Sequence, residues 1–266
     1  MTTIEGLYNF RDTGGTPLTA GGATRSGVLY RSDALSGLGE TGLSQFAATP
    51  VGVVVDFRTP TERLMAPDVL PTSRPFRMVE LSILEGAMTG LARQDASDAS
   101  PQDPAAQLEA IREALAQPPF LGDLYVGMLQ GGASAFAEVA RLVAASSDAE
   151  PTAVVVHCTA GKDRTGVSAA LILEAVGADR DAVVADYAAS AGHLAGAWSD
   201  AMLATVGGLG VAITPAVRDI VTGSPAAAIE QALAWVDAEH GGAAGYLQSG
   251  GLTDDELAAL RRRLAG

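Results

Sequence analysis

The sequence predicts an α/β protein with a mainly parallel central sheet flanked by helices. Two short and nearly continuous apolar runs, 51–57 (VGVVVDF) and 152–157 (TAVVVH), are rich in β-branched residues. Such runs are typical of strands buried on both faces of a parallel sheet. Helical patterns alternate with these strands, which favours this fold class. The chain of 266 residues is expected to form a single domain over 1–266.

The first part of the chain carries weaker signals around the strand at 51–57. Short strands are expected at 28–30 and 76–81. Thr41 is predicted to cap a helix that ends before Pro50. Residues 85–104 are small and polar and are interrupted by proline, so we interpret them as a mobile loop.

Periodicity and stop signals place the helices of the middle of the chain. Helical patterns run over about 105–116, 120–130 and 133–145, and in the last of these the apolar side chains recur on one face. A further helix is expected over 165–176, with Gly177 as its left-handed stop.

Capping signals mark the helices that follow. Asp179 is expected to cap a helix that runs to about Ser190. Two terminal helices are predicted: Ser224 followed by Pro225 opens one, and a capping box at 253–256 opens the other.

Composition excludes several classes of protein. The net charge is −14, from 17 basic and 31 acidic residues, which disfavours binding to nucleic acid and to anionic lipid. No apolar run approaches the ~18 residues of a membrane span, so we expect no stable membrane insertion. Residues 1–12 lack the basic and apolar regions of a secretory signal, which favours a cytoplasmic protein.

The single cysteine, Cys158, and the single lysine, Lys162, both lie in the segment 157–166 (HCTAGKDRTG). A lone cysteine excludes an intramolecular disulfide framework and a cysteine-rich zinc site. The segment lies between the predicted strand at 152–157 and the start of the predicted helix at 165–176. A loop in this position is able to present its backbone N–H groups and the positive end of a helix dipole to an anion.

The spacing within this loop indicates a phosphate site with a nucleophile at its base. Five residues separate Cys158 from Arg164, enough for the chain to wrap a small anion that Arg164 grips in a bidentate fork. The expected phosphate-binding residues are Cys158, Thr159, Ala160, Gly161, Lys162, Asp163, Arg164 and Thr165. The positive environment of this nest is expected to make Cys158 an activated nucleophile, and the Thr165 hydroxyl is also expected to donate to its sulfur. The alternative is an inert buried thiol beside a glycine turn.

The string H-C-x-x-G-x-x-R-T-G resembles the cysteine-dependent protein tyrosine phosphatase superfamily. A Lys-Asp pair inside the loop is similar to its bacterial branch, of the mycobacterial tyrosine phosphatase B type. Segments elsewhere also resemble that branch, namely 9–12 (NFRD) with 14–15, 29–33 (LYRSD), 56–58 (DFR) with Glu62, 245–247 (GYL) and 251–252. The resemblance extends over nearly the whole chain.

This resemblance implies hydrolysis of phosphomonoesters through a cysteinyl-phosphate, with no metal and no cofactor. Cys158 would attack phosphorus and Arg164 would stabilise the transition state. Family members act on phosphotyrosine, and some also on phosphoserine, phosphothreonine and phosphoinositides. The implied partners are therefore phosphorylated protein or phospholipid substrates and inorganic phosphate. Relatives are also exported without a recognisable signal, so export stays open beside a cytoplasmic location.

Two carboxyl groups are candidates for the general acid. The resemblance to the bacterial branch favours Asp163, whose alternative roles are to orient Arg164 or to repel acidic ligands. Asp56 is the second candidate, because ligand-facing residues collect at the ends of parallel strands. The alternative for Asp56 is a buried ion pair with Arg58 or Arg11.

The other charged residues near the loop have supporting interpretations. Lys162 is expected to contact a second phosphate or a phosphoinositide head group, or alternatively to be a solvated charge at the rim. His157 is expected to orient the loop by hydrogen bonds. A buried polar network that supports the loop is expected from Arg11, Asp12 and Arg31.

Residues 191–222 combine several glycines with large apolar residues, which suggests short apolar helices on glycine hinges. We interpret this segment as a candidate helical lid over the active site, as the related branch has. The alternative is an ordinary helical subdomain packed on the core. Two other functions stay open for the chain as a whole: a rhodanese-type sulfurtransferase and a catalytically silent phosphate-binding protein.

Overall fold

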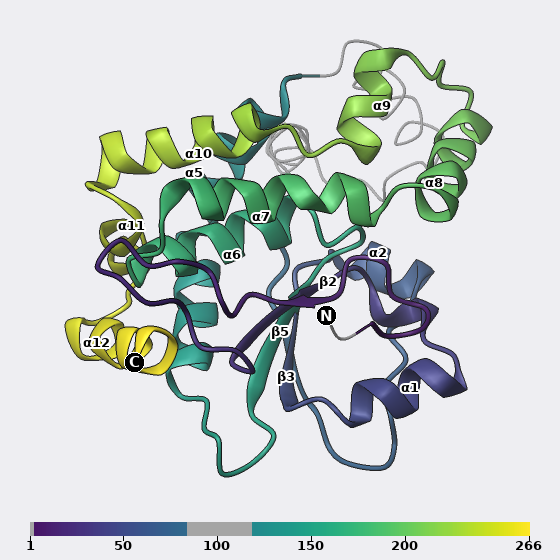
Figure 1. Ribbon diagram of the computed structural model, residues 1–266. Helices are drawn as coiled ribbons and strands as arrows, with labels where there is room; N and C mark the ends of the chain where they lie inside the picture. The colour runs from purple at the N-terminus through teal and green to yellow at the C-terminus, as the bar shows by residue number, and fades with distance from the viewer. Residues whose placement is uncertain (1–2, 84–118) are drawn as a thin grey trace, which may run out of the picture.

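A five-stranded, mostly parallel sheet forms the centre of the protein (Figure 1). The computed structural model describes residues 3–83 and 119–266. The strand order is β1-β2-β5-β3-β4, in which β1 is antiparallel to β2 and the remaining pairs are parallel. The strands are β1 Arg11–Asp12, β2 Leu29–Ser32, β3 Val51–Asp56, β4 Arg77–Glu80 and β5 Ala153–His157. The predicted fold class is confirmed, as are all four predicted strands.

Helices cover both faces of this sheet (Figure 1). They are the 3-10 helix η1 Leu35–Gly37, then α1 Glu40–Ala47, α2 Pro60–Met65, α5 Leu121–Ala144, α6 Asp163–Ala175, α7 Arg180–His193, α8 Ala197–Gly208, α9 Pro215–Thr222, α10 Ala226–His240, α11 Ala243–Ser249 and α12 Asp254–Ala265. Within the described residues, no helix has both the length and the apolar character needed to cross a membrane.

The burial pattern of β5 explains why its residues are apolar at every position before His157. Val154 and Val156 belong to the larger core, which α5, α6, α7, α10, α11 and α12 share. Ala153 and Val155 belong to a smaller core on the other face, with Phe46 of α1 and the N-terminal segment. A strand that faces a core on both sides cannot alternate between apolar and polar residues, as the sequence predicts for a buried parallel strand.

The two helices predicted at 120–130 and 133–145 form one continuous helix, α5. The pair Gly131–Gly132 between them does not break the helix. Gly132 is buried, and a Cβ atom at this position would approach the ring of Phe136 to 2.8 Å. This glycine therefore makes room for a neighbouring core side chain, which periodicity alone does not reveal.

Two of the predicted caps are wrong. Gly39, not Thr41, is at the N-cap of α1, so this helix begins at Glu40. Ser224 does not cap α10; its Oγ accepts from Ala191 N and donates to Ala188 O, both near the end of α7. The Ser224 hydroxyl therefore bonds the backbone of α7, whereas the local pattern predicts that it caps α10.

The other start and stop signals are confirmed. Asp179 caps α7, which extends to His193, and Gly177 follows α6 with a positive φ of 90°. The capping box at 253–256 opens α12. A second capping box, in which Thr59 and Glu62 bond each other's backbone N–H groups, begins α2 and was not predicted. The loop predicted at 85–104 and the helix at 105–116 lie outside the described residues.

Candidate active site

The loop 158–162 joins β5 to α6 at the carboxyl edge of the parallel strands. Cys158 follows β5 directly, and its side chain is buried in the larger core. Asp163, Arg164 and Thr165 form the first turn of α6. The loop and the first turn of α6 together therefore hold all the predicted phosphate-binding residues.

The loop carbonyl groups are bonded to donors outside the loop. Ala34 N donates to Thr159 O at 3.1 Å. The side-chain amide of Asn9 donates to Ala160 O at 3.0 Å and to Gly161 O at 2.9 Å. In a trans peptide the C=O and the following N–H point in opposite directions. The N–H groups that follow these carbonyls are therefore directed away from the outside donors, as the predicted anion nest requires.

Gly161 is the position in this loop that requires a glycine. Its φ is +66°, and a Cβ atom there would lie 2.2 Å from Ser32 O of β2. The loop is thus pressed directly against the neighbouring strand, a contact that only a residue without a side chain allows.

Buried arginines hold the outer side of the loop. Arg31 Nη2 donates to Gly161 O at 2.9 Å, and its Nη1 contacts Asp186 of α7 at 2.6 Å. Arg11 Nε contacts the same carboxylate at 2.8 Å. Burial would raise the pKa of Asp186, but the charges of Arg31 and Arg11 outweigh it and lower the pKa. The predicted supporting network is confirmed for both arginines, whereas the role of Asp186 was not predicted.

Asp12 is not part of that network. Its two carboxylate oxygens accept from Gly14 N at 2.8 Å and from Gly27 N at 2.7 Å. It therefore closes the turn-rich segment between β1 and β2 instead of supporting the loop.

Arg164 is held by Glu62, a residue that the sequence analysis named only as part of a resembling motif. Nη1 and Nη2 of Arg164 donate to the two carboxylate oxygens of Glu62 at 2.8 and 2.6 Å. Thr159 Oγ1 donates to the same carboxylate at 2.8 Å. Burial would raise the pKa of Glu62, but the hydrogen bonds and charge of Arg164 outweigh it and lower the pKa to about 2. This bidentate pair fixes the plane of the guanidinium.

Asp163 lies between a tyrosine and the lysine of the loop. Its Oδ1 accepts from the Tyr125 hydroxyl at 2.5 Å and from Lys162 Nζ at 2.9 Å. Lys162 Nζ also donates to Ile220 O of α9 at 2.8 Å. Only 1% of Lys162 is exposed, so its interpretation as a solvated rim charge is wrong.

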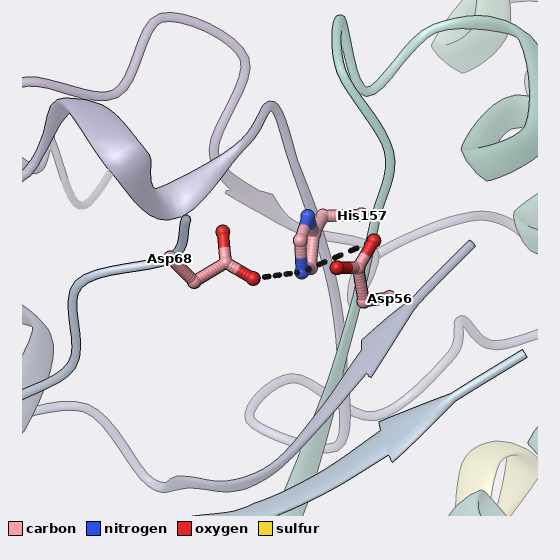
Figure 2. Close-up of side chains that lie close together, drawn as sticks. All are labelled: Asp56, Asp68 and His157. Carbon is pink, nitrogen blue, oxygen red and sulfur yellow. Dashed lines mark ion pairs between the residues drawn. The ribbon is translucent and has the colours of Figure 1, made fainter. Parts of the chain in front are cut away.

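Asp56 forms a buried ion pair with Arg58, which is the alternative considered above. Arg58 Nη2 lies 2.9 Å from Asp56 Oδ2 and 2.8 Å from Asp68 Oδ2. His157 Nε2 approaches the same Asp68 oxygen at 3.2 Å and Asp56 Oδ1 at 4.0 Å (Figure 2). Burial would raise the pKa of Asp68, but contact with His157 and Arg58 lowers it.

Asp56, Asp68 and His157 together resemble a metal-ligand set, since their ligand atoms all lie within 4.8 Å of one another. The guanidinium of Arg58 already contacts both carboxylates and supplies their counter-charge. The cluster is therefore better described as the support for the strand end that leads into Cys158. His157 Nδ1 also lies 3.4 Å from Cys158 O, in keeping with its expected orienting role.

The expected hydrogen bond from Thr165 to the Cys158 sulfur is not formed. Thr165 Oγ1 is buried and has no hydrogen-bond partner within residues 3–83 and 119–266. The short spacing in the sequence brings Thr165 close to Cys158 along the chain. The direction of the Thr165 hydroxyl, however, depends on the side-chain rotamer, which packing decides.

A cleft of about 370 Å³ lies beside the loop. Its walls include Thr159 of the loop, Glu62 and Met65 of α2, and Trp198 and Met202 of α8. Helix α8 therefore borders the space next to the phosphate loop, although it lies far from α2 in the sequence.

The loop therefore combines a buried cysteine, carbonyl groups bonded to outside donors and an arginine held by Glu62, which is the arrangement expected of a cysteine-based phosphate-binding loop. The model of the tyrosine phosphatase family matches residues 2–266, and the chain belongs to that family. It is accordingly a protein-tyrosine phosphatase, an enzyme that takes phosphorylated substrates. The matches do not support the sulfurtransferase or the silent phosphate-binding protein.

Individual relatives agree with this assignment. A tyrosine-protein phosphatase of Nostoc commune is 30% identical over 252 residues, which cover 94% of this chain and 78% of the relative. The triple specificity protein phosphatase PtpB of Mycobacterium tuberculosis is 32% identical over 202 residues, which cover 69% of this chain and 67% of the relative. The crystal structure of P. aeruginosa TpbA has a TM-score of 0.34 at 18% identity, over 79% of this chain and 88% of that one, and adds nothing to the assignment.

The Glu62–Arg164 pair predicts a pH-dependent effect of Glu62→Gln. The folded-state pKa of about 2 lies below the ordinary value of 4.5, so the carboxylate stabilises the fold above about pH 4.5 and loses this contribution as the pH falls toward 2. We expect Glu62→Gln to lower the free energy of unfolding by about 1–3 kcal/mol near neutral pH, and by much less at the acidic end. Urea unfolding of both proteins across this pH range measures the difference.

Glu80→Gln is the matched control, since Glu80 pairs with Arg63 and its side chain is 58% exposed. Glu80→Gln should change the free energy of unfolding only slightly across the whole pH range. A difference between wild type and Glu62→Gln that is as large at the acidic end as at neutral pH would contradict the assigned ionisation.

Proposed function

We propose that this phosphatase hydrolyses phosphotyrosine through a cysteinyl-phosphate on Cys158. The observation that carries the proposal is the loop itself: its carbonyls are bonded to donors outside the loop, which leaves the following amides free to face an anion, and Glu62 holds Arg164. A phosphate dianion in this nest meets backbone donors and a planar guanidinium, and both are preorganised before it binds.

The proposed reaction has two displacements at phosphorus. In the first, the Cys158 sulfur forms an S–P bond while the bond between phosphorus and the ester oxygen breaks, and Asp163 gives its proton to the departing oxygen. In the second, the Asp163 carboxylate takes a proton from water as the water oxygen attacks phosphorus. The S–P bond then breaks and inorganic phosphate leaves. Arg164 stabilises the charge on the equatorial oxygens in both steps.

Asp163 is our proposed general acid, with Asp56 as the second candidate. Asp163 begins α6 immediately before Arg164, so it belongs to the phosphate loop. Asp56 Oδ1 accepts from both N and Nε of Arg58, and its side chain is fully buried. A carboxylate held in this way supports the fold, which favours Asp163 for proton transfer.

Phosphoserine, phosphothreonine and phosphoinositides are a further proposal for the substrate range. It is supported by the relative from Mycobacterium tuberculosis, whose name records a triple specificity. Recognition of a second phosphate by Lys162 would require Nζ to leave Asp163 or Ile220 O, its two partners in this structure. Comparing phosphotyrosine peptides, phosphoserine peptides and phosphoinositides as substrates, with wild type and Lys162→Ala, tests this range.

Cys158→Ser tests the covalent mechanism. The variant should fold and bind inorganic phosphate but lose turnover, because a serine hydroxyl is not ionised at neutral pH. We expect less than about 1% of wild-type kcat on para-nitrophenyl phosphate. Mass spectrometry of acid-quenched wild-type enzyme should find phosphate on the peptide that contains Cys158. Residual turnover well above that level, or phosphate on another residue, would contradict the assignment.

Asp163→Asn tests the general acid by its dependence on the leaving group. We expect kcat to fall by about 10²-fold or more for an alkyl phosphate, and much less for para-nitrophenyl phosphate, whose leaving oxygen needs little protonation. Asp56→Asn is the matched comparison. If Asp56→Asn shows the leaving-group dependence and Asp163→Asn is uniformly mild, the acid is Asp56.

We also propose that residues 191–222 form a lid. Helices α8 and α9 of this segment pack against each other, and α8 contributes Trp198 and Met202 to the cleft. Gly196 and Gly210, at the two ends of α8, have φ values of +85° and +82°. Glycines in this conformation are suited to absorb a hinge motion.

A double substitution of Trp198 and Met202 by alanine tests the lid. It should speed inactivation of Cys158 by peroxide and raise kcat/KM for bulky substrates, because both side chains narrow the cleft beside the loop. Asp200→Ala is the control, since Asp200 is an exposed residue of the same helix. Unchanged inactivation kinetics in a folded double variant would show that α8 is a packed subdomain and not a lid.

A further inference from the structure

Two buried tyrosines from different helices form a hydrogen-bonded chain that ends at Asp163. Tyr125 of α5 is 1% exposed and Tyr187 of α7 is fully buried. Their hydroxyl oxygens are 2.7 Å apart, and the Tyr125 hydroxyl lies 2.5 Å from Asp163 Oδ1. Hydrogen bonds therefore link α5, α6 and α7 at the first turn of α6.

The direction of these hydrogen bonds follows from the number of hydrogens. Each phenol carries a single O–H. Tyr125 donates its hydrogen to Asp163, so Tyr187 must donate to the Tyr125 oxygen. Donors in such a chain polarise one another, which strengthens the bond at its end. Burial, followed by the charge of Asp163, raises the pKa of Tyr125 well above its usual value, so its phenol keeps the hydrogen that it donates.

Lys162 Nζ donates to the same oxygen of Asp163 as Tyr125 does. An oxygen that already accepts from a phenol and an ammonium group is a poor site for a further proton. When the carboxyl group is protonated, the proton is therefore on Oδ2. The two donors thus distinguish the oxygens of one carboxyl group.

We infer that Tyr125, backed by Tyr187, is a positioning residue for Asp163: it holds Oδ1 so that Oδ2 carries the proton transferred to the leaving group. The inference rests on the general-acid role proposed above for Asp163. Tyr125 acts through Asp163 and needs no contact with the substrate.

Tyr125→Phe removes the donor and keeps the ring in place. We expect kcat to fall about tenfold for an alkyl phosphate, a part of the ~10²–10⁴-fold that a general acid contributes, and to stay within about twofold for para-nitrophenyl phosphate. Tyr187→Phe should act in the same direction but less strongly, because Tyr125 can still donate to Asp163.

Tyr246→Phe is the matched control. Tyr246 is also 1% exposed, and its hydroxyl donates to Leu129 O at 2.7 Å, away from Asp163. The thermal stability of Tyr246→Phe should fall by an amount similar to that of Tyr125→Phe. Its ratio of kcat for the alkyl phosphate to kcat for para-nitrophenyl phosphate should stay at the wild-type value. This comparison separates a loss of packing from a loss of positioning.

A double-mutant cycle with Asp163→Asn separates this inference from the function on which it rests. When Asp163→Asn is already present, adding Tyr125→Phe should cause no further leaving-group dependence. Equal losses on both substrates, or a selective loss that persists in the Asp163→Asn variant, would overturn the positioning role. If Asp163→Asn is selective for the poor leaving group and Tyr125→Phe is not, the inference alone fails. If Asp163→Asn is not selective, the acid assignment fails first.

Discussion

The hydrogen bonds that hold the loop carbonyls outward are the constraint on which the site depends. A concave anion nest needs its N–H groups inside, and each buried carbonyl on the outside then needs a donor. Asn9 and Arg31 supply these donors from segments more than a hundred residues away. Asn9 is held in turn by Asp33, whose carboxylate accepts from Asn9 N at 2.9 Å. The N-terminal segment therefore supports the loop of the proposed phosphate site.

Buried ion pairs gather positive charge around the loop in a chain with a net charge of −14. Lys162 of the loop, Arg164 of the first turn of α6, and Arg31 and Arg58 of neighbouring segments each pair with a carboxylate. Long-range repulsion by surface carboxylates is screened by salt, whereas the fixed dipoles and charges in the nest act at short range. The cations are thus held around the proposed phosphate site.

Lys162 connects the catalytic loop to the candidate lid. Its ammonium group is buried between the carboxylate of Asp163 and a backbone carbonyl of α9. Tyr125 of α5 donates to the same carboxylate, and its hydroxyl is in turn bonded to that of Tyr187 of α7. Asp163 is therefore contacted both from the rigid core and, through Lys162, from the segment proposed to move.

The sequence by itself determined the fold class, four of the five strands of the described sheet and the loop segment 157–166, because these depend on local patterns. Buried strands need continuous apolar runs, and the loop needs a cysteine, a glycine and an arginine at set intervals in one short segment. Only the tertiary structure decided what each charged group does. Glu62, Asp68, Asp186 and Tyr125 lie in ordinary local sequence, and their roles arise from partners far away in the chain. For the same reason Asp56 and Lys162, which are equally plausible as ligand-facing residues in sequence, turn out to be buried beside Arg58 and Asp163.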